Sequence, residues 1–289
     1  MLDRDSRTLP VIVSSRAAWL LCVLIFSACW LWPSTAPASG PPEDPILRID
    51  SGMHTAKLWS VDTGPQGETL LTCSNDKTLR LWDLDSGRLE KTMRVPIDRA
   101  KDGMLYACAL SADGKTVAAG GWTGYNAQNG HNIYLQDPST GRITERISGL
   151  SNVIDHLAFS PDGRYLAATL GSDNGLRVYR TKDWSLVVKD TDYRDKSYWA
   201  DFAPDGSLVT VSYDGYVRLY DRNFDLVAKE EAPGGEKPFS CAFSPDGERI
   251  AVGFKDSTRV NVLSGEDLEH LYSPDTSGVD NGSLNSVAW

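Results

Sequence analysis

The chain has 289 residues, of which 41% are hydrophobic and 24% charged, so it is long enough to bury the core of one large or two small globular domains. Its formal net charge of -10 disfavours a nucleic-acid-binding protein, because such proteins present a basic surface to phosphates. Its 25 glycines and 15 prolines indicate many short strands joined by turns.

The N-terminal residues are predicted to be a signal peptide. Residues 17–32 read AAWLLCVLIFSACWLW, follow a basic stretch and precede an Ala-Pro-Ala site, so we expect cleavage after Ala38. Two alternatives stay open, namely retention of residues 17–32 as a membrane anchor and lipid attachment at Cys29. A cleaved signal peptide over residues 1–38 predicts an exported protein, periplasmic or secreted, that begins with a short linker at 39–45. The membrane would be involved only through an uncleaved N-terminal segment.

Cysteine and histidine spacing predicts no metal or cofactor site. Outside the N-terminal apolar run, Cys73, Cys108 and Cys241 are widely spaced and form no CxxC pair. The 4 histidines have no ligand-like spacing either. We therefore expect these three cysteines to be small buried apolar residues.

A turn tetrapeptide recurs along the rest of the chain. Its copies are SADG (111–114), SPDG (160–163), APDG (203–206) and SPDG (244–247), with GPQG (64–67) as a weaker first copy. An apolar strand precedes each copy, as in DHLAF, and a β-rich strand follows it, as in YLAATL. A third strand and a more polar fourth strand complete each unit of about 40–45 residues, which is the period of a β-propeller blade.

The first strands of these units align in apolar columns. There are two such columns, and they stand two residues apart, so both point to the same side of their strands. Both columns are apolar, as expected where neighbouring sheets cover each other's faces. Asp201 stands where the other units carry alanine. It is either a satisfied buried carboxylate or a channel residue, and the sequence leaves both readings open.

Residues 46–289 resemble the WD-repeat (WD40) β-propeller family, and the first unit carries the resemblance best. It contains MHTA (53–56) in place of the usual Gly-His, and LWD (81–83) supplies the Trp-Asp pair. The resemblance implies an all-β fold of four-stranded WD40-type blades. It also implies a structural, non-catalytic hydrogen-bonded tetrad of His54, Thr72, Asp76 and Trp82. Later units keep only the blade-turn aspartates Asp173, Asp214 and Asp256.

Five complete units are followed by SLNSVAW (283–289), which matches the first strand of a sixth. We expect an incomplete seven-bladed ring whose C-terminal part is truncated, with ILRID (46–50) as the strand that closes it. The alternative is a natural five-bladed ring. The sequence is also similar to bacterial exported WD-repeat proteins, some of which are joined to caspase-like protease modules.

No catalytic motif is present, so we expect a non-catalytic protein–protein interaction scaffold that binds protein partners and no nucleic acid. The alternative function is a sensor or docking arm of a longer enzyme, for example a caspase-like protease. A third hypothesis is a hydrolase or ligand-binding site in the central channel, near Asp155, His156 and Asp201.

Two long loops supply the candidate partner-binding residues. The turn at 122–131 in the second unit and the loop at 191–198 before the fourth both carry aromatic side chains beside hydrogen-bonding groups. Aromatic residues and arginine dominate the energetics of protein interfaces. The candidate contact set is Trp122, Tyr125, Asn126, His131, Tyr193, Arg194 and Tyr198.

Overall fold

A computed structural model describes residues 52–124, 130–279 and 286–289. The chain divides into two compact units, residues 1–50 and 51–289, and the described residues belong to the second. The predicted signal peptide, the linker, the predicted closing strand and the candidate residues Tyr125 and Asn126 lie outside the described residues.

Within the described residues, twenty strands form five antiparallel sheets of four strands each. The first sheet holds β1 (Leu58–Thr63), β2 (Thr69–Ser74), β3 (Leu79–Asp83) and β4 (Leu89–Met93). The second holds β5 (Met104–Leu110), β6 (Val117–Trp122), β7 (His131–Gln136) and β8 (Ile143–Leu150). The third holds β9 (Ile154–Phe159), β10 (Tyr165–Leu170), β11 (Leu176–Arg180) and β12 (Leu186–Asp190). The fourth holds β13 (Ser197–Phe202), β14 (Leu208–Ser212), β15 (Tyr216–Tyr220) and β16 (Leu226–Glu231), and the fifth holds β17 (Pro238–Phe243), β18 (Arg249–Phe254), β19 (Val260–Ser264) and β20 (His270–Tyr272).

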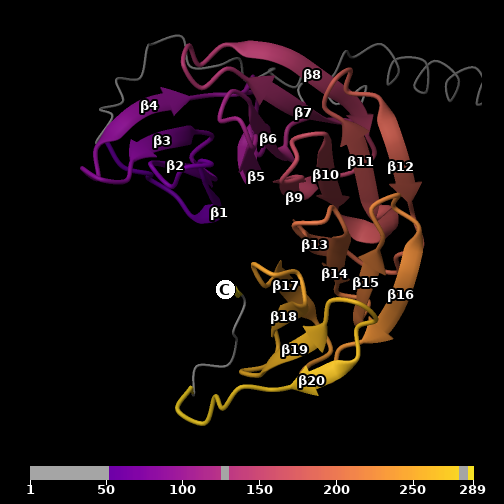
Figure 1. Ribbon diagram of the computed structural model, residues 1–289. Coiled ribbons are helices and arrows are strands. Elements are labelled where there is room, and N and C mark those ends of the chain that lie inside the picture. Colours follow the sequence, from indigo (N-terminus) through magenta and orange to yellow (C-terminus); the bar gives the residue numbers. More distant parts are fainter. Residues whose placement is uncertain (1–51, 125–129, 280–285) are drawn as a thin grey trace, which may run out of the picture. The chain divides into compact units, whose positions relative to one another are not determined.

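Every sheet is a meander in which strands consecutive in the chain are neighbours in space. The first strands, β1, β5, β9, β13 and β17, lie innermost, and each contacts the innermost strand of the next sheet (Figure 1). This is the arrangement of blades in a β-propeller, as the repeat period predicts. The predicted fold class is therefore confirmed, with five blades and part of a sixth.

The repeated tetrapeptide closes the turn between the first two strands of a sheet. In the third sheet, Ser160 Oγ donates to Asp162 Oδ1 at 2.6 Å and accepts from the backbone N–H of Tyr165 at 3.0 Å. Gly163 takes φ +70°, a left-handed conformation that a Cβ atom disfavours. The turn thus satisfies its own polar groups, which explains why Ser, Asp and Gly recur together.

Hydrophobic clusters lie between neighbouring sheets rather than within single sheets. One cluster joins Ile133 and Leu135 of the second sheet to Leu157 and Leu166 of the third. Three further clusters bridge the first to the second sheet, the third to the fourth, and the fourth to the fifth. The outermost strands stay more exposed, as Ile143, at 42% exposure, illustrates. Stacking therefore supplies the core that one sheet alone cannot provide.

Polar bonds also join successive innermost strands. Asp62 Oδ2 accepts from the backbone N–H of Leu110 at 2.7 Å, and Asp201 Oδ2 accepts from that of Phe243 at 2.7 Å. Of the two readings of Asp201, the hydrogen bond supports a satisfied, largely buried carboxylate.

The described residues at the C-terminus contact the fifth sheet. Trp289 Nε1 donates to the backbone oxygen of Ala242 on β17 at 2.8 Å. Within the part of the chain that the structure describes, no helix has the length and apolar character needed to cross a bilayer.

Candidate interaction surface

The four side chains of the predicted tetrad meet in the first sheet. Trp82 Nε1 donates to Thr72 Oγ1 at 2.9 Å, and His54 Nε2 lies 2.8 Å from the same hydroxyl. His54 Nδ1 lies 3.0 Å from Asp76 Oδ2. Burial opposes ionisation of Asp76, but hydrogen bonds from Thr78, Thr55 and His54 outweigh it and lower the pKa of this carboxyl. The network links the loop before β1 to the turn between β2 and β3.

In the fourth sheet a tyrosine-based network takes the same place. Tyr193 Oη lies 2.7 Å from Thr210 Oγ1 and 2.9 Å from Tyr220 Oη, and Tyr220 donates to Asp190 at 2.7 Å. Tyr193 lies four residues before β13, as His54 lies four residues before β1, and Thr210 occupies the place in β14 that Thr72 occupies in β2. Arg218 holds Asp214 at 2.6 Å and lies 3.9 Å from the centre of the Tyr193 ring. Sequence reasoning missed this network because tyrosine replaces both histidine and tryptophan.

The blade-turn aspartates differ between sheets. Asp214 and Asp256 accept backbone N–H groups of the loops before β13 and β17, at 3.2 Å from Arg194 and 3.0 Å from Glu236. Asp173 is exposed in the 3₁₀ turn Ser172–Asn174, and its neighbour Asn174 accepts from Ser151 Oγ at 2.5 Å instead. In the third sheet, the contact between this turn and the loop before β9 is therefore made by Asn174 and not by the predicted Asp173.

We call the rim formed by the loops before the innermost strands and the turns between second and third strands the upper rim. The candidate contact set does not form one surface there. Tyr193 is only 3% exposed because its hydroxyl serves the internal network, so it is not available to a partner. Trp122 is the last residue of β6, and its Nε1 is buried without a hydrogen-bond partner among the described residues. His131 is half-buried against it at 5.6 Å, and desolvation lowers the pKa of the imidazole. Arg194 remains exposed, and Tyr198 is half-buried.

A row of aromatic side chains that the sequence analysis did not identify lies along the upper rim. One residue near the start of each innermost strand occupies the same repeat position, and we call these residues the rim row. Its members are Trp59, Tyr106, Asp155, Tyr198 and Phe239.

The rings of the rim row contact one another. The centres of Trp59 and Tyr106 are 4.8 Å apart, and Tyr198 stacks on Phe239 at 4.9 Å. Tyr213, from the turn after β14, lies 4.4 Å from Tyr198. All of these aromatic side chains are half-buried, so each keeps part of its surface open to solvent. Aligning the repeats by their turn tetrapeptides would have revealed the row, because its members stand five residues before the turn.

Two of the three residues of the channel hypothesis, His156 and Asp201, line a small cavity of roughly 270 Å³. Asp62, His156 and Asp201 line it, whereas Asp155 belongs to the rim row. Burial lowers the pKa of His156 to about 3, and the ring stacks on Trp199 with centres 3.9 Å apart. A neutral, stacked imidazole whose Nδ1 accepts from the backbone of Ala200 at 3.4 Å is engaged in packing rather than in proton transfer.

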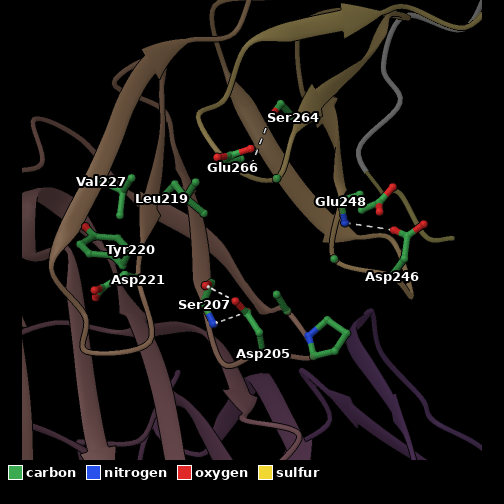
Figure 2. A pocket seen from close by; sticks show the side chains of 14 residues that line it. Asp205, Ser207, Leu219, Tyr220, Asp221, Val227, Asp246, Glu248, Ser264 and Glu266 are labelled. Atoms are coloured by element: carbon green, nitrogen blue, oxygen red, sulfur yellow. Dashed lines mark hydrogen bonds between the residues drawn. The ribbon is translucent and has the colours of Figure 1, made fainter.

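A larger groove of roughly 670 Å³ lies on the opposite, lower rim, between the fourth and fifth sheets (Figure 2). Turns line it, and its carboxylates serve those turns. Asp205 accepts from the backbone N–H of Ser207 at 2.9 Å, and Asp246 accepts from that of Glu248 at 3.0 Å (Figure 2). The groove therefore follows from turn geometry, and its carboxylates at Asp205 and Asp246 are already hydrogen-bonded within their own turns.

Comparison with known proteins supports the WD40 repeat family. The family model "WD domain, G-beta repeat" matches residues 51–83, 143–180 and 197–221. The chain is 23% identical over 257 residues to a guanine nucleotide-binding protein subunit beta of Nicotiana tabacum, which covers 83% of the chain and 65% of that relative.

Two further relatives match parts of the chain. A WD repeat-containing protein of Synechocystis, sll1491, is 25% identical over 150 residues, covering 52% of the chain and 39% of the relative. The Drosophila melanogaster protein groucho is 28% identical over 176 residues, covering 61% of the chain and 22% of the relative. The chain thus spans less than two thirds of the length of each of these relatives.

Proposed function

We propose that this WD40-type β-propeller is a non-catalytic scaffold that binds a protein partner on its upper rim. The rim row carries the proposal, because it places four half-buried aromatic side chains on one rim of a rigid set of sheets. Aromatic anchors bury much area and lose little rotamer freedom on binding. The WD-repeat relatives support an interaction role of this kind.

Affinity capture with purified variants tests the docking surface. We expect Tyr106→Ala and Phe239→Ala to lose the partners that the wild type recovers, as identified by mass spectrometry. Glu248→Ala and Glu266→Ala, at exposed positions of the lower rim, should keep them. Recovery of the same partners by both rim-row variants would refute the upper rim as the docking surface.

His54→Ala separates stability from binding. Loss of a buried hydrogen-bond partner costs about 1–3 kcal/mol, so this variant should unfold at a lower urea concentration. Its folded fraction should still capture the partner, because His54 acts inside the first sheet.

We further infer that the scaffold works outside the cytoplasm, on the basis of the apolar run at residues 17–32 and the Ala-Pro-Ala site. A mature N-terminus at Ser39 would support this inference, and one at Met1 would contradict it. The alternative role, a docking arm of a longer caspase-like enzyme, rests on the sequence resemblance, and the complete reading frame would decide it.

A further inference from the structure

The rim row contains one residue that is not aromatic. The first, second, fourth and fifth sheets place Trp59, Tyr106, Tyr198 and Phe239 at this position, and the third places Asp155 there. In every sheet the register shifts at this residue, so each member of the row is the extra residue of a β-bulge. Bulges redirect a side chain out of the regular alternation and occur often beside functional sites. The bulge that presents an aromatic ring in four sheets therefore presents a carboxylate in the third.

Asp155 is buried, and one of its two carboxylate oxygens has no partner among the described residues. The residue is 9% exposed, and Oδ2 has no hydrogen bond to any of the described residues. By contrast, Asp62 and Asp201 on other innermost strands each accept a backbone N–H. An ionised group buried in this way is costly unless another group pairs with it.

Groups from three directions surround Asp155. Its strand β9 packs between β5 and β13, which carry Tyr106 and Tyr198 of the rim row. Burial raises the pKa of Asp155 to about 7, and the positive charge of the exposed Lys196 opposes this shift. Lys196 makes no hydrogen bond to Oδ2 of Asp155 in the described part of the chain. The neighbouring His156 is neutral above about pH 3 and adds no charge.

The upper rim is suited to positive charge. Burial raises the pKa of the Tyr198 phenol, and the nearby charges of Asp155 and Asp195 raise it further. Rings of the rim already accept cations from the chain itself, because Lys57 Nζ lies 3.6 Å from the centre of Trp59. Flanking aromatic faces and a central carboxylate together are complementary to an ammonium or guanidinium group.

We propose that Asp155 anchors a cationic side chain, lysine or arginine, of the protein partner that docks on the upper rim, with Tyr106 and Tyr198 on either side of it. The proposal rests on the proposed function, because it identifies which chemistry of the partner the rim recognises. The incoming cation pairs with the carboxylate of Asp155, whose Oδ2 has no partner among the described residues, and this pairing offsets the cost of the buried charge.

Binding should depend on pH in a direction set by this carboxylate. Only the ionised form pairs with a cation, and lysine and arginine stay charged over the relevant range. With the pKa of Asp155 at about 7, the ionised fraction rises about tenfold between roughly pH 6 and pH 8, so affinity should rise by about the same factor. Burial raises the pKa values of the Tyr198 and Tyr213 phenols, so both stay neutral through this range.

The test uses the full chain with aspartate labelled with ¹³C at the carboxyl carbon, and Asp155→Asn assigns the resonance of Asp155. N-acetyl-arginine amide and N-acetyl-lysine amide serve as probes, and N-acetyl-citrulline amide is the neutral control. We expect both cationic probes, but not citrulline, to lower the apparent pKa of Asp155 in the NMR titration. We also expect Asp155→Asn to weaken probe binding about tenfold or more at pH 8, since a charge-assisted pair is lost. The matched variant Asp201→Asn, which changes a satisfied carboxylate on β13, should bind within about twofold of the wild type.

Three results would overturn the proposal. They are a pKa of Asp155 at or below its usual value in the free chain, an equal response to citrulline, and undiminished probe binding by Asp155→Asn. The first is measured on the wild type and needs no variant to fold.

Partner capture by the rim-row variants is a separate measurement. If partners bind the rim but Asp155→Asn captures them as well as the wild type, only the anchor is wrong. If the probe binds Asp155 but no partner depends on the rim, the proposed function fails instead.

Discussion

Three aspartates on innermost strands show how one residue type acquires different properties from its contacts. Asp62 and Asp201 each accept a backbone N–H from the next sheet, whereas Asp155 has no partner for Oδ2. Burial raises the pKa of Asp201 to about 6, because its hydrogen bonds offset only part of the desolvation. At Asp155 burial raises the pKa to about 7. The presence or absence of a backbone N–H partner thus distinguishes the two carboxylates that join neighbouring sheets from Asp155, which we propose binds a cation.

Asp155→Asn should stabilise the fold by an amount that grows with pH. A carboxyl whose folded pKa is raised contributes its stability below the unfolded value near 4 and loses it as pH rises through the folded value near 7. The asparagine variant has no such loss, so its advantage over the wild type should reach about 2–4 kcal/mol by roughly pH 8. Urea unfolding at about pH 4.5 and pH 8 measures the difference, with the exposed Asp173→Asn as control. An advantage that is equal at both values would show that Asp155 is not the titrating group.

The strands and turns were predictable from sequence because the same order of residue types recurs in the repeats. An apolar strand, a turn that ends in Asp-Gly and a β-rich strand follow one another in four of the five units. The site was harder to predict, because exposure depends on contacts between loops. Tyr193 looked like a loop aromatic, yet its hydroxyl completes an internal network with Thr210 and Tyr220. The members of the rim row can be found by aligning the turn tetrapeptides, but the direction of their side chains is set by a β-bulge, which only strand pairing reveals.

Substitutions at Gly163 test the turn that ends β9. Its φ of +70° is left-handed, and an added Cβ would meet only the Cβ of Ala112 at 3.8 Å, so strain and not collision sets the cost. Gly163→Ala should destabilise the fold by about 1–2 kcal/mol. Gly163→Asn should cost less, because asparagine tolerates this conformation. Equal losses for the two variants in urea unfolding would show that the left-handed backbone is not the cause.

The five sheets share their cores, so destabilisation should spread to neighbours rather than to the whole array at once. Leu157 belongs to the cluster between the second and third sheets, and Leu263 to that between the fourth and fifth. Each Leu→Ala change should cost about 2–5 kcal/mol. The free thiols of Cys108 and Cys241 are almost fully buried in the second and fifth sheets and report on local opening.

We therefore expect Leu157→Ala to accelerate alkylation of Cys108 more than that of Cys241, and Leu263→Ala to do the reverse. Mass spectrometry of the labelled peptides gives both rates in one experiment. Equal acceleration at the two thiols in either variant would indicate that the array opens as a single cooperative unit.

Sharing of the hydrophobic clusters also bears on how such a chain can change over generations. Among the described sheets, hydrophobic contact with neighbours helps to hold each sheet in place, in addition to its own hydrogen bonds. The first sheet keeps a histidine network, the fourth has a tyrosine network, and the third uses Asn174 where others use aspartate. The residues of one repeat can therefore be substituted independently of the other repeats. The loops of a single sheet can change to bind a new partner while the remaining sheets preserve the fold.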